Sequence, residues 1–466
     1  MRLSSLPAPC LWCVLMTLPI LVASTLSAQQ TALDRYVAKP DSSYRWKTIK
    51  RIKIPGATTW IIEMTSQRWR TPAEVNRPVW KHWLVVVKPD RVDTDTGLLF
   101  ISGGSNGGDP PTEPDERTKK LALLSHSVVA TLKMVPNQPL IFHGDGHERK
   151  EDDLVAYTWD QYFKTGDPTW PARNPMVKSA VRAMDTITAA MAQPEAGNTK
   201  VDKFVVAGGS KRGWTTWITG AVDRRVVAII PIVIDVLNVA KSMRHHYAAY
   251  GFWAPSVGDY VRHKIFARMN SPRMQSLQEL VDPYFYRDRL AMPKYIMNAA
   301  GDQFFVPDSS RFYFDDLKGE KYLRYFPNAD HSLKDTNAVE DLLAFYLTVL
   351  KHKTRPHLTW NFAADGSIRV HTDQPPARAL LWQATNPTAR DFRVETFGKK
   401  YTSTELQPVA RGTYVARVAE PAKGWTAFFV ELTYDIGEVV PLQLTTAVRI
   451  VPDTLPFADK DPTCAE

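Results

Sequence analysis

The stretch Lys203-Phe-Val-Val-Ala-Gly-Gly-Ser-Lys-Arg-Gly-Trp214 decides the fold of this 466-residue chain. The apolar run from Phe204 to Ala207 has the length and composition of a buried strand. It leads into the turn around Ser210, and a helix-like stretch begins at Trp214. A serine in a tight turn between a strand and a helix has its hydroxyl exposed above the edge of the sheet. The segment therefore predicts a nucleophilic serine at position 210.

The glycines around this serine depart from the usual pattern. That pattern is G-x-S-x-G, because small neighbours allow the helix to pack close to the strand. Gly208 fits the first position, but Arg212 occupies the second and Gly213 follows one residue later. An ordinary Gly-Ser turn is the alternative interpretation. The strand before Ser210 and the helix after it favour a catalytic serine.

Strand-like and helix-like segments alternate on both sides of the turn. The residues from Tyr44 to Val87 alternate like antiparallel strands, and Leu98 to Ser102 is an apolar run that ends in glycines. Further apolar runs lie at 128–135, 226–234, 295–299 and 322–326, and helical periodicity lies at 178–191. Such alternation indicates a mostly parallel sheet covered on both faces. The predicted fold class is α/β, an α/β-hydrolase fold with helices on both faces of the sheet.

Changes in composition predict the domain organisation. Residues 1–28 resemble a secretory signal peptide cleaved after Ala28, with a retained N-terminal anchor as the alternative. Residues 29–355 form the predicted α/β-hydrolase domain, in which the aromatic-, Met- and Arg-rich segment at about 236–292 predicts a helical cap insertion. Residues 356–455 contain short, evenly spaced β-rich runs and predict a C-terminal β-sandwich domain.

Cysteine content, charge and hydropathy limit the classes of function. After signal cleavage only Cys464 remains, which excludes an intrachain disulfide. The net charge of +9 is spread along the chain without a DNA- or RNA-binding motif, so we expect no nucleic-acid partner. This basic balance is compatible with anionic substrates or an anionic envelope surface. No later segment is apolar enough for an integral membrane span, so we expect a secreted or periplasmic protein. The sequence leaves the oligomeric state open.

The partners of the serine follow it in the chain. A neutral serine needs a base to take its proton and an acid to orient that base, and in this fold the order is serine, acid, histidine. Asp302 follows one strand-like run and His331 follows the next. We therefore predict a Ser210-Asp302-His331 triad, with a surface-loop histidine as the alternative for His331. Asp235 also follows an apolar strand and is the rival acid, whereas Asp308 and Asp330 are more typical of turn-capping residues.

Residues around the triad are candidates for binding. The oxyanion of the tetrahedral intermediate requires backbone N–H donors. We predict the amide of Lys211 and amides of the glycine loop 103–108, at Gly104 and Ser105. Lys211 and Arg212 also suit an interaction of positive charge with the oxyanion or a substrate carboxylate, with simple solvation as the alternative. The predicted substrate-binding residues are Arg212, Trp214, His246 and Trp253. The alternative is core packing for the two tryptophans and exposure to solvent for His246.

A metal site and a cofactor are not expected. His143, Asp145, His147 and Glu148 are residue types that a metal accepts, but the glycines between them indicate a loop and no H-E-x-x-H helix or cysteine set accompanies them. Acyl transfer through a serine needs no cofactor. The expected partner is a small-molecule or peptide substrate.

Three segments carry a resemblance to a known family. Ser210-Lys-Arg-Gly-Trp-Thr-Thr-Trp217, Asp152-Asp-Leu-Val-Ala-Tyr-Thr-Trp159 and Ala183-Met-Asp-Thr186 resemble the PhoPQ-activated pathogenicity-related protein family. The resemblance runs from about Leu33 to Val451. It implies an exported relative of α/β-hydrolases, with a eukaryotic branch similar to secreted proliferation-repressing proteins, and it implies no particular substrate. The Ser-x-x-Gly turn is also similar to that of glucuronoyl esterases, in which a basic residue follows the serine.

The predicted function is acyl transfer to water. Ser210 attacks, His331 acts as base and then as acid, and Asp302 orients the imidazole. The scissile bond is an ester or a peptide or amide bond, and the resemblance keeps an aminopeptidase-like activity open. The alternative is a catalytically inactive hydrolase-fold protein that binds or signals at the cell envelope or outside the cell. The altered turn at Arg212 is the main support for that alternative.

Overall fold

The computed structural model describes residues 30–464. The predicted signal peptide lies outside these residues. The first helix, α1 (Ala32–Ala38), begins at a capping box in which Thr31 and Asp34 exchange hydrogen bonds. Within residues 30–464, every helix is too short or too polar to cross a lipid bilayer.

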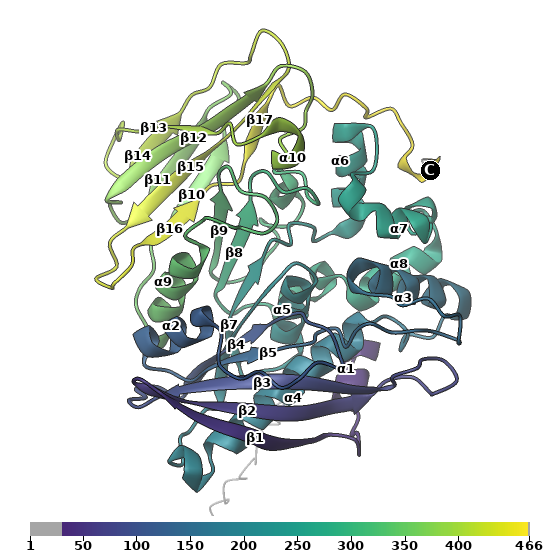
Figure 1. Cartoon of the computed structure of the whole chain (residues 1–466). Helices are drawn as coiled ribbons and strands as arrows, with labels where there is room; N and C mark the ends of the chain where they lie inside the picture. Colours follow the sequence, from purple (N-terminus) through teal and green to yellow (C-terminus); the bar gives the residue numbers. More distant parts are fainter. Residues whose placement is uncertain (1–29, 465–466) are drawn as a thin grey trace, which may run out of the picture.

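One long mixed sheet organises the chain (Figure 1). Its first three strands are antiparallel: β1 (Arg45–Ile54), β2 (Ala57–Arg68) and β3 (Val79–Pro89). Six further strands are parallel to one another: β4 (Thr96–Ile101), β5 (Val129–Leu132), β6 (Lys203–Gly209), β7 (Val226–Ile232), β8 (Lys294–Ala299) and β9 (Lys321–Phe326). The spatial order is β1-β2-β3-β5-β4-β6-β7-β8-β9, so β4 and β5 are exchanged relative to the sequence.

Helices cover both faces of this sheet. On one face lie α2 (Glu116–Ser125) and α9 (Ala338–Leu350), and on the other α4 (Arg173–Met191) and α5 (Lys211–Val222) (Figure 1). Alternate residues of β6 pack against the two helical layers. Val205 packs with α2 and α9, and Val206 packs with α4 and α5. A buried parallel sheet between two helical layers confirms the predicted α/β-hydrolase fold class.

The segment between β7 and β8 is mainly helical. It contains α6 (Val239–Tyr250), α7 (Gly258–Arg262) and α8 (Pro272–Val281), joined by short 3-10 turns. A further helix, α3 (Glu151–Thr165), follows β5 and lies beside α7 and α8 (Figure 1). This arrangement places the predicted cap segment next to the beginning of α3.

The residues after α9 form antiparallel β-structure. A three-stranded sheet contains β10 (Leu358–Phe362), β11 (Ile368–Thr372) and β14 (Thr413–Ala416). The remaining strands are β12 (Arg378–Asn386), β13 (Thr402–Glu405), β15 (Trp425–Tyr434), β16 (Leu442–Thr445) and β17 (Arg449–Val451), with the short helix α10 (Val394–Phe397) after β12. The β-rich C-terminal part is thus as predicted, although β16 also pairs with β9 through Thr445 and Leu323, so that the main sheet continues into it.

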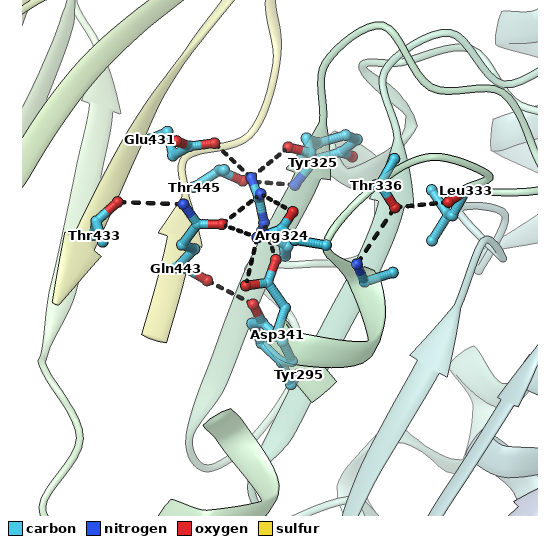
Figure 2. A network of polar contacts seen from close by, with 12 residues as sticks. Tyr295, Arg324, Tyr325, Leu333, Thr336, Asp341, Glu431, Thr433, Gln443 and Thr445 are labelled. Atoms are coloured by element: carbon cyan, nitrogen blue, oxygen red, sulfur yellow. Dashed lines mark hydrogen bonds and ion pairs between the residues drawn. The ribbon is translucent and has the colours of Figure 1, made fainter. Parts of the chain in front are cut away.

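A buried network of charges holds this junction together (Figure 2). Arg324 on β9 donates from Nε to Asp341 of α9 at 2.6 Å and from Nη1 to Glu431 of β15 at 2.6 Å. Its Nη2 donates to Gln443 of β16 at 2.8 Å. All three charged side chains are at most 6% exposed. The single arginine therefore joins the central sheet, a covering helix and the C-terminal strands.

Candidate active site

Ser210 lies in a strained turn between β6 and α5. Its backbone has φ 57° and ψ −126°, a conformation that residues with a side chain rarely adopt. The Ser210 N–H donates to the carbonyl of Ile232 at the end of β7, at 2.8 Å. The neighbouring strand therefore holds the serine in place at the carboxyl end of the sheet.

The two glycines of the turn are required by close contacts. A Cβ at Gly208 would lie 2.9 Å from the carbonyl oxygen of Arg212, and a Cβ at Gly213 would lie 2.9 Å from that of Gly208. After the serine, it is therefore position 213 and not position 212 that must be small. The turn accommodates the side chain of Arg212. The departure from G-x-S-x-G does not disturb the turn.

Ser210 opens into a cavity with mainly apolar walls. The apolar side chains that line it include Trp159, Trp214, Met243, Phe266, Phe304 and Phe305. Its polar members besides Ser210 are Asp152, Arg173, Lys211 and Tyr260. Residues of α3, α5, the inserted α6 and α7, and the loop after β8 thus meet at the serine.

Asp302 and His331 are in direct contact. The Nδ1 of His331 lies 2.8 Å from Oδ2 of Asp302, whose side chain is buried. A carboxylate accepts, so Nδ1 carries the proton and Nε2 is left as a base. Asp302 also accepts from the N–H of Phe304 at 2.7 Å, and Gln303 accepts from the N–H of His331 at 3.1 Å. The carboxylate and the imidazole are both fixed in orientation.

The imidazole is not hydrogen-bonded to the serine. His331 Nε2 is buried and has no hydrogen-bond partner within residues 30–464. The ring of Phe304 packs on the imidazole with centroids 4.4 Å apart, and the same side chain lines the cavity at Ser210. The structure therefore assembles the Asp302–His331 pair and leaves Nε2 without a partner. Contacts of this kind are often completed only when substrate is bound.

The rival acid Asp235 has other partners. Its carboxylate accepts from the hydroxyls of Tyr313 and Tyr325, each at 2.6 Å. Burial raises the pKa of Asp235 to about 7, although both hydroxyls lower it. The carboxylate that contacts His331 is that of Asp302.

Asp308 and Asp330 also have other partners. Asp308 is buried between His245 of α6, at 2.8 Å, and Arg390, at 2.7 Å. Asp330 accepts from the N–H of Ser332 at 2.9 Å, which is the turn-capping geometry.

The segment after β12 holds both loops of the Asp302–His331 pair. The N–H of Val394 donates to the carbonyl of Gly301 at 2.9 Å. Asn328 and Tyr401 exchange two hydrogen bonds, at 2.8 and 2.9 Å. The C-terminal part thus contacts the residue before the acid and the turn before the histidine.

Lys211 directly follows the serine, and the loop with the other two predicted oxyanion donors begins beside the turn. Lys211 is the first residue of α5, so its N–H has no acceptor within the helix. Ile101 at the end of β4 pairs with Gly208, which brings the following glycine loop beside the turn. In that loop Gly104 has φ 129°, and neither Gly104 nor Ser105 donates a backbone hydrogen bond to another described residue. The oxyanion role of these three amides stays a prediction.

Arg212 does not lie where the sequence prediction placed it. Its guanidinium donates two hydrogen bonds to Glu151, at 2.8 and 2.6 Å, and one to the carbonyl of Val135 at 2.5 Å. Lys211 Nζ also pairs with Glu151 at 2.8 Å. Burial would raise the pKa of Glu151, but these two cations lower it to about 2. Arg212 is therefore engaged by Glu151 and is not among the residues that line the cavity.

Of the other predicted substrate residues, only Trp214 lines the cavity. His246 is buried and accepts from the N–H of Ala254 at 3.1 Å, and burial lowers its pKa to about 3. Trp253 stacks on Phe266 with centroids 4.0 Å apart and so lies behind the cavity wall. His246 and Trp253 are packing residues in this structure.

Sequence reasoning missed several residues around the cavity. Phe304 and Phe305 follow Asp302 after one intervening residue, so two aromatics close behind the acid were an available signal. Arg173 gave no signal, because its place beside Ser210 depends on how α4 packs against α5. Within residues 30–464, no group of three metal-ligating side chains comes together.

The chain is similar to several known proteins. A family model described as PhoPQ-activated pathogenicity-related protein matches residues 33–393. The chain is 38% identical over 469 residues to autocrine proliferation repressor protein A of Dictyostelium discoideum, covering 94% of this chain and 93% of that protein. Among solved structures it is similar to an acetyl xylan esterase of a Thermoanaerobacterium species (TM-score 0.47, 13% identity, 68% of this chain and 92% of that one). It is also similar to a glucuronoyl esterase of Solibacter usitatus (TM-score 0.39, 14% identity, 67% and 86%).

Proposed function

The chain belongs to the PhoPQ-activated pathogenicity-related protein family, and we propose that it is a serine hydrolase that acts through Ser210, His331 and Asp302. The observation that carries the proposal is the 2.8 Å contact of Asp302 with His331, which leaves a buried Nε2 without a partner. The strained turn at Ser210, open to the cavity, supports it as well.

The proposed reaction cleaves an ester or a peptide or amide bond. Ser210 Oγ attacks the carbonyl carbon while His331 Nε2 takes its proton, and the amides of Lys211, Gly104 and Ser105 stabilise the oxyanion. The imidazolium then protonates the leaving alcohol or amine. Water, activated by the same nitrogen, releases the acid and restores Ser210. Since no hydrogen bond joins Ser210 to His331 in the described structure, the proposal requires this contact to form when substrate enters.

Labelling by a fluorophosphonate probe tests this proposal. We expect purified mature protein to be labelled, and Ser210→Ala and His331→Ala to lose at least about 99% of the labelling rate. The first variant lacks the nucleophile, and in the second the serine is unactivated and therefore a poor nucleophile. The measurement is probe fluorescence on the intact protein over time. Ser332→Ala is the matched control, since this exposed serine lies beside His331 and only caps a turn. Labelling of Ser210→Ala at the rate of the wild type would refute the proposed nucleophile.

The second candidate function is binding or signalling without catalysis. It is favoured by Phe304, which packs on His331 and lines the cavity, and by the 38% identical relative, whose name describes repression of proliferation. Failure of the folded wild type to react with the probe would support this function in place of hydrolysis.

We also propose that the protein is exported and is secreted or periplasmic. Helix α1 begins at its own cap, Thr31, three residues after the predicted cleavage site at Ala28. Cleavage after Ala28 therefore removes none of the described residues. We expect N-terminal sequencing of the exported protein to begin at Gln29. A mature protein that retains Met1 would contradict cleavage and support the N-terminal anchor.

A further inference from the structure

Arg173 is a buried cation without an acidic partner. Its side chain is about 1% exposed, and it forms no ion pair with any carboxylate of the described residues. Nη1 donates to the carbonyl of Lys211 at 2.9 Å, the guanidinium lies 4.3 Å from the ring of Trp214, and Nε has no hydrogen-bond partner in this part of the chain. Arginine is almost never fully buried unless it is paired. Arg173 therefore has unused capacity for an anion.

The neighbouring carboxylates are already engaged by other groups. Asp152 pairs with Lys211 at 3.0 Å through one oxygen and accepts from the hydroxyl of Tyr260 at 3.0 Å through the other. Glu151 pairs with Lys211 and Arg212. Of the cations Arg173, Lys211 and Arg212, only Arg173 thus forms no ion pair with either carboxylate.

The three cations of this cluster are more deeply buried than Glu151. The side chains of Lys211 and Arg212 are 6% and 11% exposed, whereas that of Glu151 is 42% exposed and reaches solvent. Arg173 lines the cavity that contains Ser210. An unpaired charge in such a place is costly, and a bound anion would offset that cost.

We propose that this cavity binds a substrate group that carries a carboxylate, and that Arg173 pairs with it. The inference rests on the proposed function, because it places this carboxylate next to the bond that Ser210 attacks. The planar guanidinium suits a carboxylate through two parallel hydrogen bonds, and the face of Trp214 holds its plane. The apolar walls of the cavity accommodate the carbon chain between the carboxylate and the scissile carbonyl.

The test compares two esters of equal chain length that end in a carboxylate or in a methyl group. The probes are the 4-nitrophenyl monoester of glutaric acid and the 4-nitrophenyl ester of pentanoic acid. We expect kcat/KM to favour the glutarate ester by roughly 10- to 100-fold, as is usual for hydrogen bonds to charged groups. Arg173→Met should bring this ratio close to one. Arg182→Met, which changes a partly exposed arginine of the same helix, should leave the ratio as in the wild type.

Binding to an inactive variant separates this inference from the proposed function. Calorimetric titration of Ser210→Ala with monomethyl glutarate and with its uncharged counterpart methyl pentanoate should show binding of monomethyl glutarate that is lost on adding Arg173→Met. This result would stand even if the wild type cleaved neither ester. Cleavage of both esters at equal kcat/KM would overturn the inference and leave Arg173 a positioning residue that holds the carbonyl of Lys211.

Two further arms complete the test. If Arg173→Met does not fold, Arg173→Lys keeps the charge without the planar fork, and its ratio should fall between those of the wild type and one. A ratio equal to that of the wild type would mean that no paired contact is made. A peptidyl ester is also tested with its terminal carboxyl free and with this carboxyl amidated. Preference for the free form would identify a peptide as the source of the carboxylate, and no preference would favour a small dicarboxylic acid.

Discussion

Replacement of Arg324 by methionine is expected to lower the free energy of unfolding by about 3–5 kcal/mol, because it leaves two buried carboxylates without their cation. Asp341 and Glu431 both pair with this guanidinium at 2.6 Å. They belong to a covering helix and to a C-terminal strand, so the substitution destabilises the packing of both elements against the central sheet. The measurement is equilibrium unfolding in urea, followed by fluorescence and by circular dichroism.

The size of this loss should depend on pH. Burial raises the pKa of Asp341 to about 6, although Arg324 lowers it. At pH 5 the variant can bind a proton at this carboxyl, so the expected loss is smaller at pH 5 than at pH 8. Arg369→Met is the control, since it breaks only an exposed pair with Asp365 and should cost no more than about 1 kcal/mol. Equal stabilities of the two variants would contradict the role assigned to the network.

Local sequence patterns were sufficient for the turn and for the order of the site residues. A buried strand, a glycine turn and a helix are all encoded within twelve residues around Ser210, and the sheet then fixes where the next strands end. Asp302 and His331 follow two adjacent parallel strands, β8 and β9, so the topology brings their loops to one edge. The contact between them is a consequence of this order.

The direction of long polar side chains could not be predicted in this way. Arg212 contacts Glu151, which lies 61 residues earlier, and the first turn of α3 has to be placed before that contact exists. His246 likewise faces the core because α6 packs against the loop at Ala254. Basic and aromatic residues near a catalytic serine have the same local pattern whether they point toward a cavity or away from it.

The junction with the C-terminal part also had no local signal. The alternating strands predicted β-structure after residue 356, but the register of β16 against β9 rests on one pair of residues, Thr445 and Leu323. The hydrogen bond from Val394 to Gly301 is similarly long-range. Such contacts depend on tertiary packing, which overrides the pattern within each strand.

Replacement of Asp302 by asparagine is expected to reduce kcat by about 10⁴-fold with little change in fold, if the proposed triad acts as described. An amide in this place can donate to Nδ1 and so stabilise the tautomer that carries its proton on Nε2. That nitrogen then cannot accept the proton of Ser210. The measurement is kcat for an activated ester, together with the rate of fluorophosphonate labelling.

Asp235→Asn is the matched control, because it changes the rival acid in the same way. Its kcat should stay within about threefold of the wild type, since its carboxylate contacts two tyrosines and the imidazole is bound by Asp302. A large loss in Asp235→Asn with none in Asp302→Asn would identify Asp235 as the acid.

The effect expected of Asp235→Asn is on stability instead. In the wild type, the pKa of the Asp235 carboxyl is raised to about 7 in the folded state. The folded protein therefore binds a proton at this carboxyl more tightly than the unfolded chain does. The stabilisation from that proton is complete below about pH 4 and is lost as the pH rises to about 7, so the wild type should lose stability relative to Asp235→Asn across this range.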